Sequence, residues 1–170
     1  GWHGNPSGLE GQHLAWVDTI MAPEHYKLLP ATLPPLRWLQ LPDLYLISSA
    51  GNPETFSAFL GKLRSSLARG IRLVQWREPD WPGGADAPTL YAAMQEALAY
   101  CHAAGARMLI NSMHPATWWH EADGVHLRAG HARAYQQSGT SPFSDQADKS
   151  IAVSAHDVDD IRIARELRAD

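Results

Sequence analysis

Short apolar runs alternate with amphipathic stretches from Asp43 onward, and this rhythm limits the fold of the 170-residue chain more than any other feature. Strands are predicted at the apolar runs, which cover residues 44–47, 71–76, 107–110, 124–127 and 151–154. Short apolar strands separated by helices are typical of a parallel sheet with helical crossovers. A spacing of roughly 20–35 residues between strands favours an α/β fold of the (βα)8 TIM-barrel type, with a flavodoxin-like open sheet as the alternative. About five βα units are present, so the sequence predicts a partial barrel that belongs to a longer protein.

Helix signals occur between the predicted strands. Asn52-Pro53-Glu54 combines a capping side chain, a first-turn proline and an acidic group, and Gly70 ends this helix. A second helix is marked by apolar residues at helical spacing, namely Leu90, Met94, Leu98 and Cys101. A third helix is predicted from Asp157 to Leu167.

Composition and charge exclude several classes of protein. The formal net charge is -4 at pH 7, whereas nucleic-acid and anionic-membrane binders normally carry a basic face. No run approaches the roughly 18 apolar residues of a membrane span. The single cysteine, Cys101, excludes an internal disulfide and fits a reducing compartment. We therefore expect a cytoplasmic protein that binds neither nucleic acid nor membranes.

Polar side chains follow each predicted strand, where parallel α/β folds place their active sites. They are Ser48, Ser49, Arg77, Glu78, Asn111, Ser112, Arg128, Ser154 and His156. An arginine fork at the end of the second strand suits a phosphate or carboxylate. The alternative is that Arg77 and Glu78 form a surface ion pair, and that Asn111 is a turn former.

The nine histidines do not favour a metal site. His114, His120, His126 and His131 are spaced by five or six residues, whereas ligands on one helical face are three or four apart. His126 is predicted to lie in the core or the barrel interior, and Trp118 and Trp119 in the core or an interface. Cys101 lies on the apolar side of its helix and is not expected to be a nucleophile.

The ordered segments LYLIS, LVQWREPD, RMLINSMHPA, EADGVHLRAG and IAVSAHD resemble the thiamine phosphate synthase and thiazole tautomerase superfamily. The resemblance covers roughly residues 42–170 and implies a βα-barrel. It implies one of two reactions on a small phosphorylated ligand. The synthases join a pyrimidine pyrophosphate to a thiazole phosphate with magnesium, and the tautomerases aromatise a thiazole carboxylate phosphate without a metal.

The resemblance assigns roles to particular positions. Gln75 and Arg77 match the substrate-contacting Q-x-R-E stretch, and Asn111 matches the asparagine that opens the third-strand motif. Ser154 and His156 match the S-x-H motif after the fifth strand. The resemblance to the tautomerases implies that this histidine is the acid–base catalyst, so His156 is the predicted catalytic residue. The predicted substrate-binding residues are Gln75, Arg77, Asn111 and Ser154.

Three departures separate the chain from the synthases. The lysine after R-E is Pro79 here, and the two magnesium-binding aspartates are Ser112 and His131. Magnesium prefers oxygen ligands, among them carboxylates, and neither Ser112 nor His131 supplies a carboxylate. Mg2+ is therefore expected only if synthase activity is retained, and a tautomerase-like or degenerate barrel fits better. The family's glycine-rich phosphate loop is expected beyond Asp170.

The first residues, GNPSGLEGQHLAWV, resemble the final strand region of MutT-like Nudix hydrolases. The predicted domains are a Nudix remnant at residues 1–17, a proline-rich linker at 18–41 and the truncated barrel at 42–170. The main prediction is a domain of a Nudix fusion protein that binds thiazole phosphate or thiamine phosphate in thiamine biosynthesis. The alternatives are a non-catalytic barrel attached to an 8-oxo-dGTP diphosphatase-type Nudix hydrolase, and a thiamine phosphate sensor. Homo-oligomer formation stays open.

Overall fold

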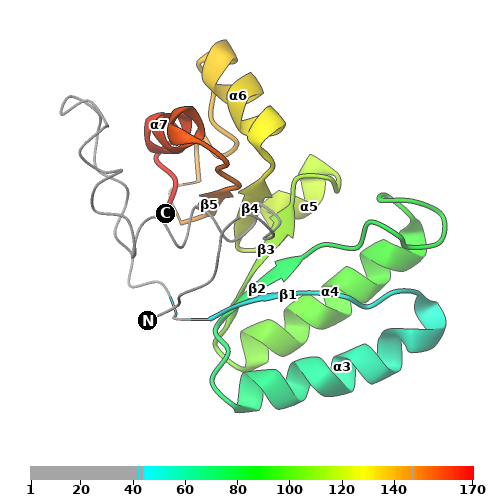
Figure 1. Ribbon diagram of the computed structural model, residues 1–170. Helices are drawn as coiled ribbons and strands as arrows, with labels where there is room; N and C mark the ends of the chain where they lie inside the picture. Colours follow the sequence, from blue (N-terminus) through cyan, green and yellow to red (C-terminus); the bar gives the residue numbers. More distant parts are fainter. Residues whose placement is uncertain (1–41, 43, 147) are drawn as a thin grey trace. The chain divides into compact units, whose positions relative to one another are not determined.

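The computed structural model describes residue 42, residues 44–146 and residues 148–170 (Figure 1). The predicted Nudix remnant and linker, residues 1–41, lie outside the described residues and stay predictions. The described residues form two compact units. Among the described residues, the first unit comprises those from 42 to 126 together with 143–150, and the second comprises 127–142 with 151–170.

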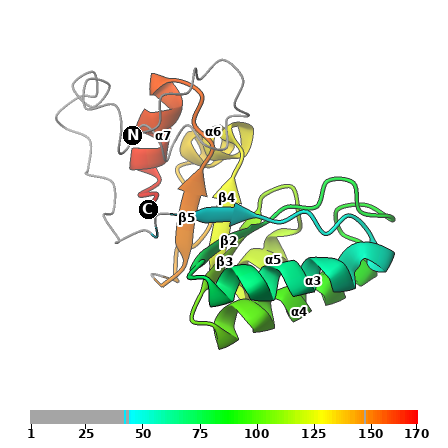
Figure 2. The same cartoon turned by 60° about the horizontal axis from the view of Figure 1, so that its bottom comes forward.

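Five strands form one sheet, and strands that follow each other in the chain are neighbours in it. The strands are drawn as arrows in Figure 2. They are β1 (Tyr45–Ile47), β2 (Leu73–Trp76), β3 (Arg107–Asn111), β4 (Gly124–Leu127) and β5 (Ser150–Val153). The pairs from β1 to β4 are parallel. The predicted strands are therefore confirmed, with small shifts at their ends, and the architecture is an α/β fold consistent with a partial TIM barrel.

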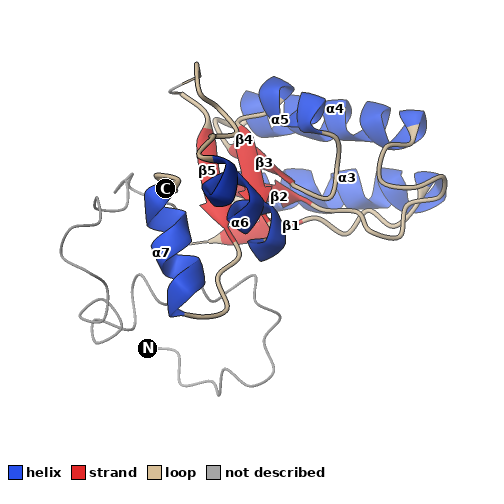
Figure 3. Cartoon of the chain, turned by 90° about the horizontal axis from the view of Figure 1, so that it is seen from above, coloured by secondary structure: helices blue, strands red, loops and turns tan. Residues whose placement is uncertain are grey.

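Five helices alternate with these strands in the described part of the chain (Figure 3). They are α3 (Pro53–Ala68), α4 (Pro88–Ala103), α5 (Ala116–Glu121), α6 (Ala129–Ser138) and α7 (Val158–Glu166). Asn52 caps α3 as predicted, because its side chain accepts from the N–H groups of Glu54 and Thr55. None of the described helices has the length and apolar character needed to cross a membrane.

Helix α6 was not predicted, and its composition explains why. Only Ala132 of its ten residues is buried, so the segment lacks the apolar stripe that marks an amphipathic helix. The helix ends where Gly139 adopts a left-handed conformation at φ 66°. Capping chemistry, rather than hydrophobic periodicity, thus marks the end of this helix.

The strand register divides the residues of the sheet between two faces. Tyr45 lies beside Leu73, Gln75 beside Leu109, and Asn111 beside His126. Because side chains alternate along a strand, all six project from one face. Trp76, Ile110 and Val125 are also register neighbours and project from the other face. The face that carries Tyr45, Gln75, Asn111 and His126 therefore holds polar groups from four consecutive strands.

The opposite face is apolar and is covered by helices of the first unit. Phe59 of α3 makes an edge contact with Trp76, with 6.0 Å between the ring centroids. Trp76, Val74, Met108 and Ile110 are all essentially inaccessible to solvent. Burial of this apolar face supplies the main driving force for folding, and it leaves the polar face available for a site.

Candidate functional site

Gln75 and Asn111, two of the predicted substrate-binding residues, are in direct contact in the first unit. Gln75 is the third residue of β2 and Asn111 the last of β3, and both side chains are buried. Asn111 Nδ2 donates to Gln75 Oε1 over 2.8 Å. Parallel neighbouring strands that end at one edge of the sheet produce this contact, as expected for residues at the carboxyl ends of strands.

The hydrogen bonds fix the orientation of both amides. Asn111 Oδ1 accepts from the N–H of Met113 at 3.1 Å, so Asn111 Nδ2 must face Gln75 and meet its oxygen. Gln75 Nε2 consequently faces away from Asn111, and no described residue accepts a hydrogen bond from it, although the side chain is fully buried. A polar neighbour of the Gln75 amide is the Tyr45 hydroxyl, whose pKa is raised by burial and lowered in part by this amide. An unsatisfied buried donor costs about 1–3 kcal/mol. Such a donor suits a bound acceptor group.

Tyr45 and His126 extend this polar face to β1 and β4, and the sequence did not single them out as site residues. The Tyr45 hydroxyl lies 3.1 Å from His126 Nδ1. Burial raises the pKa of Tyr45, and a weaker polar contact with the Gln75 amide opposes this rise. Burial, assisted by the charge of Arg77, lowers the pKa of His126 to about 4. Both groups are therefore neutral at pH 7, and His126 is an interior histidine, as predicted.

Arg77 follows β2 directly and is half-buried. No described residue forms a hydrogen bond or ion pair with its guanidinium group. The positive charge contributes to the lowered pKa of both His126 and His114, so the guanidinium belongs to the same polar region. A half-buried arginine without a carboxylate partner is suited to bind an anion such as a phosphate.

Glu78 is not the ion-pair partner of Arg77, so the alternative of a surface pair is wrong. Its carboxylate is buried and accepts hydrogen bonds from Ser48 Oγ and from the N–H groups of Ala50 and Gly51. Ser48 Oγ in turn accepts from the N–H of Arg77 at 2.9 Å. Glu78 therefore fixes the loop after β1 and, through Ser48, the backbone that carries the Arg77 guanidinium.

His114 ties a third loop to the same region. The N–H of Glu78 donates to His114 Nε2 at 3.2 Å, so Nδ1 carries the proton and donates to the carbonyl of Ala85 at 2.8 Å. Burial lowers the pKa of His114, and its ring stacks on Trp118 with 5.5 Å between centroids. The imidazole is thus a neutral structural bridge between loops, and Trp118 lies in the core, as predicted.

Ser154 and His156 belong to the second unit. Ser154 is buried, and its N–H donates to the carbonyl of Leu127 at 2.8 Å. His156 is exposed, and its N–H donates to Asp160 Oδ2 at 3.0 Å. Their predicted roles in binding and catalysis remain predictions.

The residues predicted to replace the magnesium-binding aspartates, Ser112 and His131, do not fit this metal. Ser112 offers a hydroxyl in place of a carboxylate, and its N–H donates to the carbonyl of His126 at 2.9 Å. His131 Nε2 lies 3.0 Å from Arg128 Nη2 and therefore acts as an acceptor for a cationic donor. Neither residue supplies the charged oxygen that Mg2+ prefers.

The lowered pKa of His126 makes stability depend on pH. In the unfolded chain this histidine binds a proton below about 6.5, whereas in the folded protein it does so only below about 4. The contribution of His126 to the unfolding free energy is therefore complete above pH 6.5, and about 3 kcal/mol is lost as the pH drops to 4. Urea unfolding of wild type and His126→Gln at several pH values tests this, since the variant should lack this part of the slope. An equal pH dependence of the unfolding free energy in both proteins would contradict this role of His126. His114 is present in both proteins, so its contribution cancels in the comparison.

The whole α/β region of the chain matches the model of a known protein family. A family model for thiamine monophosphate synthase matches residues 44–170, a range that includes all described strands and helices. A search of curated proteins found no match. The family match agrees with the order of strands and helices, and it confirms the thiamine phosphate synthase resemblance of the strand motifs. The chain therefore belongs to the thiamine monophosphate synthase family.

Proposed function

We propose that the chain binds a small phosphorylated intermediate of thiamine biosynthesis, thiazole phosphate or thiamine phosphate, in the cytoplasm. The observation that carries the proposal is the half-buried Arg77, whose guanidinium has no acceptor among the described residues. In this role Arg77 binds the phosphate. Gln75 Nε2, the unsatisfied donor beside Asn111, binds an acceptor atom of the ligand.

The reaction that fits these residues best is a metal-independent proton transfer of the tautomerase type. His156 moves the proton, and Ser154 contacts the substrate. Histidine suits this task because an ordinary imidazole titrates near neutral pH. The exposed imidazole of His156 supports the assignment, since a proton shuttle needs access to substrate and solvent. The replacement of the magnesium ligands by Ser112 and His131 supports a route without metal.

Replacing Arg77 tests the binding proposal. Arg77→Gln is expected to weaken binding of thiazole phosphate by about ten- to a hundredfold, because hydrogen bonds between charged groups are lost. Arg77→Lys should recover part of the affinity, since the charge stays but the fork is lost. Isothermal titration calorimetry on the full chain measures all three proteins.

A matched control is Arg69→Gln, which removes an exposed arginine at the C-terminal end of α3. The affinity of this variant for thiazole phosphate should equal that of the wild type. Arg69 precedes β2 and Arg77 follows it, so the two arginines lie at opposite ends of the strand. Equal weakening in both variants would indicate a general charge effect and would refute Arg77 as the phosphate anchor.

A second candidate function is ligand binding without turnover, as in a barrel attached to a Nudix hydrolase. The loss of the lysine at Pro79 and of the aspartates at Ser112 and His131 favours it. Incubation of the full chain with thiazole carboxylate phosphate separates the two functions. Conversion to the aromatic isomer that is lost in His156→Ala supports the tautomerase, whereas binding with no conversion supports the second candidate.

A further inference from the structure

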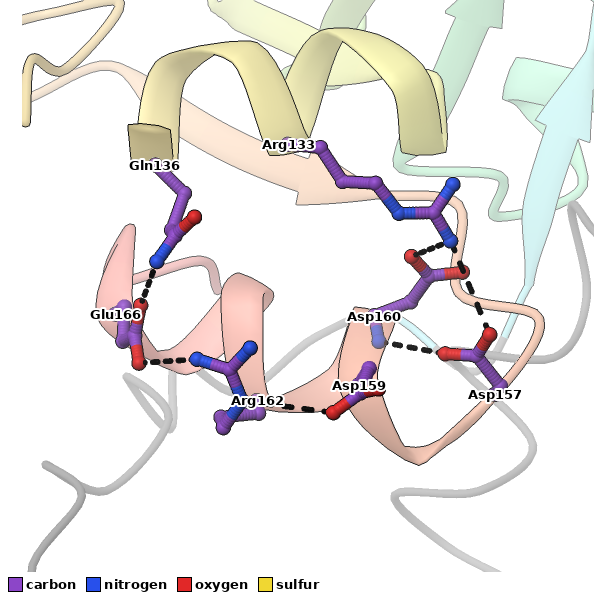
Figure 4. Close-up of polar contacts among 7 residues, drawn as sticks. All are labelled: Arg133, Gln136, Asp157, Asp159, Asp160, Arg162 and Glu166. Carbon is purple, nitrogen blue, oxygen red and sulfur yellow. Dashed lines mark hydrogen bonds and ion pairs between the residues drawn. The ribbon is translucent and has the colours of Figure 1, made fainter. Parts of the chain in front are cut away.

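We infer that Asp160 and Arg133 are positioning residues for His156, because together they hold the backbone of the residue that carries the imidazole. Figure 4 shows the side chain of Arg133 directed toward Asp160. The inference deepens the proposed function and rests on it, since His156 has its role only if the chain transfers protons. All three residues belong to the second unit.

Asp160 is the centre of the arrangement. Only 1% of its side chain is exposed, although it carries a carboxylate. Aspartate is almost never fully buried unless it is paired. Its Oδ2 accepts from the N–H of His156 at 3.0 Å, and its Oδ1 lies 2.6 Å from Arg133 Nη2. Oδ2 is therefore hydrogen-bonded to the loop before α7, whereas Oδ1 is held by the ion pair with α6 and accepts no hydrogen bond from the described residues.

The bond to His156 differs from ordinary helix capping. Asp157 is the N-cap of α7, and its side chain accepts from the N–H of Asp160 at 2.8 Å. In a capping box, the side chain at the third helical position reaches back to the N–H of the N-cap residue itself. Asp160 instead reaches one residue further, to His156. A contact that served only to cap α7 would not need to restrain this residue.

Arg133 holds the carboxylate in the orientation that reaches His156. Besides its 2.6 Å ion pair with Asp160, its guanidinium lies 3.8 Å from Asp157 Oδ2. Asp160 is buried and Arg133 is 45% exposed, so loss of Arg133 leaves a buried carboxylate without its cationic partner, and the pair links α6 to α7. The backbone of His156 is thus fixed to two helices, while its imidazole stays exposed. Such an arrangement sets the place from which a proton is transferred without blocking access.

The neighbouring ion pairs on α7 differ in burial and provide a control. Arg162 lies 2.7 Å from Glu166 and 3.6 Å from Asp159, whose side chain is 80% exposed. Figure 4 shows Arg162 between these two carboxylates on α7. Exposed pairs contribute little to stability. Asp159→Asn therefore removes a carboxylate one residue away from Asp160 without touching the contact to His156.

Amide hydrogen exchange tests the positioning contact in the full chain. Asp160→Ala should speed exchange at the His156 amide by about ten- to a hundredfold, while the Ile163 amide inside α7 changes much less. Asp160→Asn keeps an oxygen acceptor and should stay within about threefold of wild type, as should Asp159→Asn. Arg133→Gln should also speed exchange at His156. Unchanged exchange at His156 in Asp160→Ala, or an equal rise throughout α7, would overturn the inference.

Turnover of thiazole carboxylate phosphate tests the catalytic consequence. Asp160→Ala should lower kcat about tenfold or more with KM nearly unchanged, because misplacement of a reacting group slows the chemical step. Asp160→Asn should restore most of this loss. An unchanged kcat in Asp160→Ala would overturn the inference. If the wild-type protein neither binds nor converts the ligand, the proposed function fails and the catalytic claim fails with it; the exchange data then show separately whether Asp160 holds His156.

Discussion

The Gly124→Ala variant is expected to lose about 3 kcal/mol of unfolding free energy. Gly124 begins β4 with a φ of 146°, a conformation that residues with a Cβ rarely adopt. A Cβ built there would overlap the carbonyl oxygen of Ser150 and would come within 2.7 Å of its nitrogen. These are backbone atoms at the start of β5, so the clash can be relieved only by moving a strand. Strain and overpacking each cost about 1–3 kcal/mol.

Gly61→Ala is the matched control for this variant. Gly61 lies in the middle of α3 and is exposed, and a methyl group added to it would meet nothing within 4 Å. Alanine has the higher helix propensity, so this variant should gain about 0.5–1 kcal/mol. Urea unfolding followed by circular dichroism measures both changes. A Gly124→Ala protein as stable as wild type would refute the close approach of Gly124 and Ser150.

The Glu78→Ala variant is expected to lose about 3 kcal/mol of unfolding free energy and most of its phosphate affinity. Removing the carboxylate leaves the buried N–H of Ala50 and the N–H of Gly51 without their acceptor, together with Ser48 Oγ. Each unsatisfied buried donor costs about 1–3 kcal/mol. Ser48 also accepts from the N–H of Arg77, so release of Ser48 frees the backbone that carries the guanidinium.

Two further variants separate the role of the Glu78 carboxylate from that of charge in general. Glu78→Gln keeps one acceptor oxygen, and its loss of stability should lie between those of wild type and Glu78→Ala. Glu96→Ala removes an exposed carboxylate on α4 and should stay within about 0.5 kcal/mol of wild type. Urea unfolding gives the stabilities, and calorimetry with thiazole phosphate gives the affinities. Wild-type stability in Glu78→Ala would show that the carboxylate does not hold the loop.

The strands and the first helix could be predicted because their signals are local. Apolar runs marked the strands, and Asn52-Pro53 marked the start of α3, so burial and capping chemistry were sufficient there. Helix α6 has only Ala132 buried and carries no periodic signal. Its position depends on the fold around it rather than on its own composition.

The candidate site was predicted in part, and its contacts depend on strand register. Gln75, Arg77 and Asn111 were identified from their places at strand ends and from the family motif, but the bond between Gln75 and Asn111 joins residues 36 positions apart. The contact of Tyr45 with His126 spans 81 positions. Neither contact can be predicted from one sequence without knowledge of the register of β1 to β4. Polar residues on the same face of successive strands would have been the signal to follow.

Glu78 shows a second limit of sequence reasoning. Its position next to Arg77 suggested a salt bridge, because adjacent opposite charges are the simplest pair to propose. Successive residues at the end of a strand point to opposite sides, so the two side chains diverge. The loop after β1 then supplies three donors to the carboxylate, and Arg77 is left without a partner among the described residues.

The most direct test of the central claim is calorimetric titration of the full chain with thiazole phosphate and with the same thiazole alcohol lacking the phosphate. Binding of the phosphorylated compound should be saturable, and binding of the alcohol should be at least about tenfold weaker, because Arg77 binds the phosphate. Equal affinity for the two compounds, or no binding of the phosphorylated one, would contradict phosphate binding by Arg77.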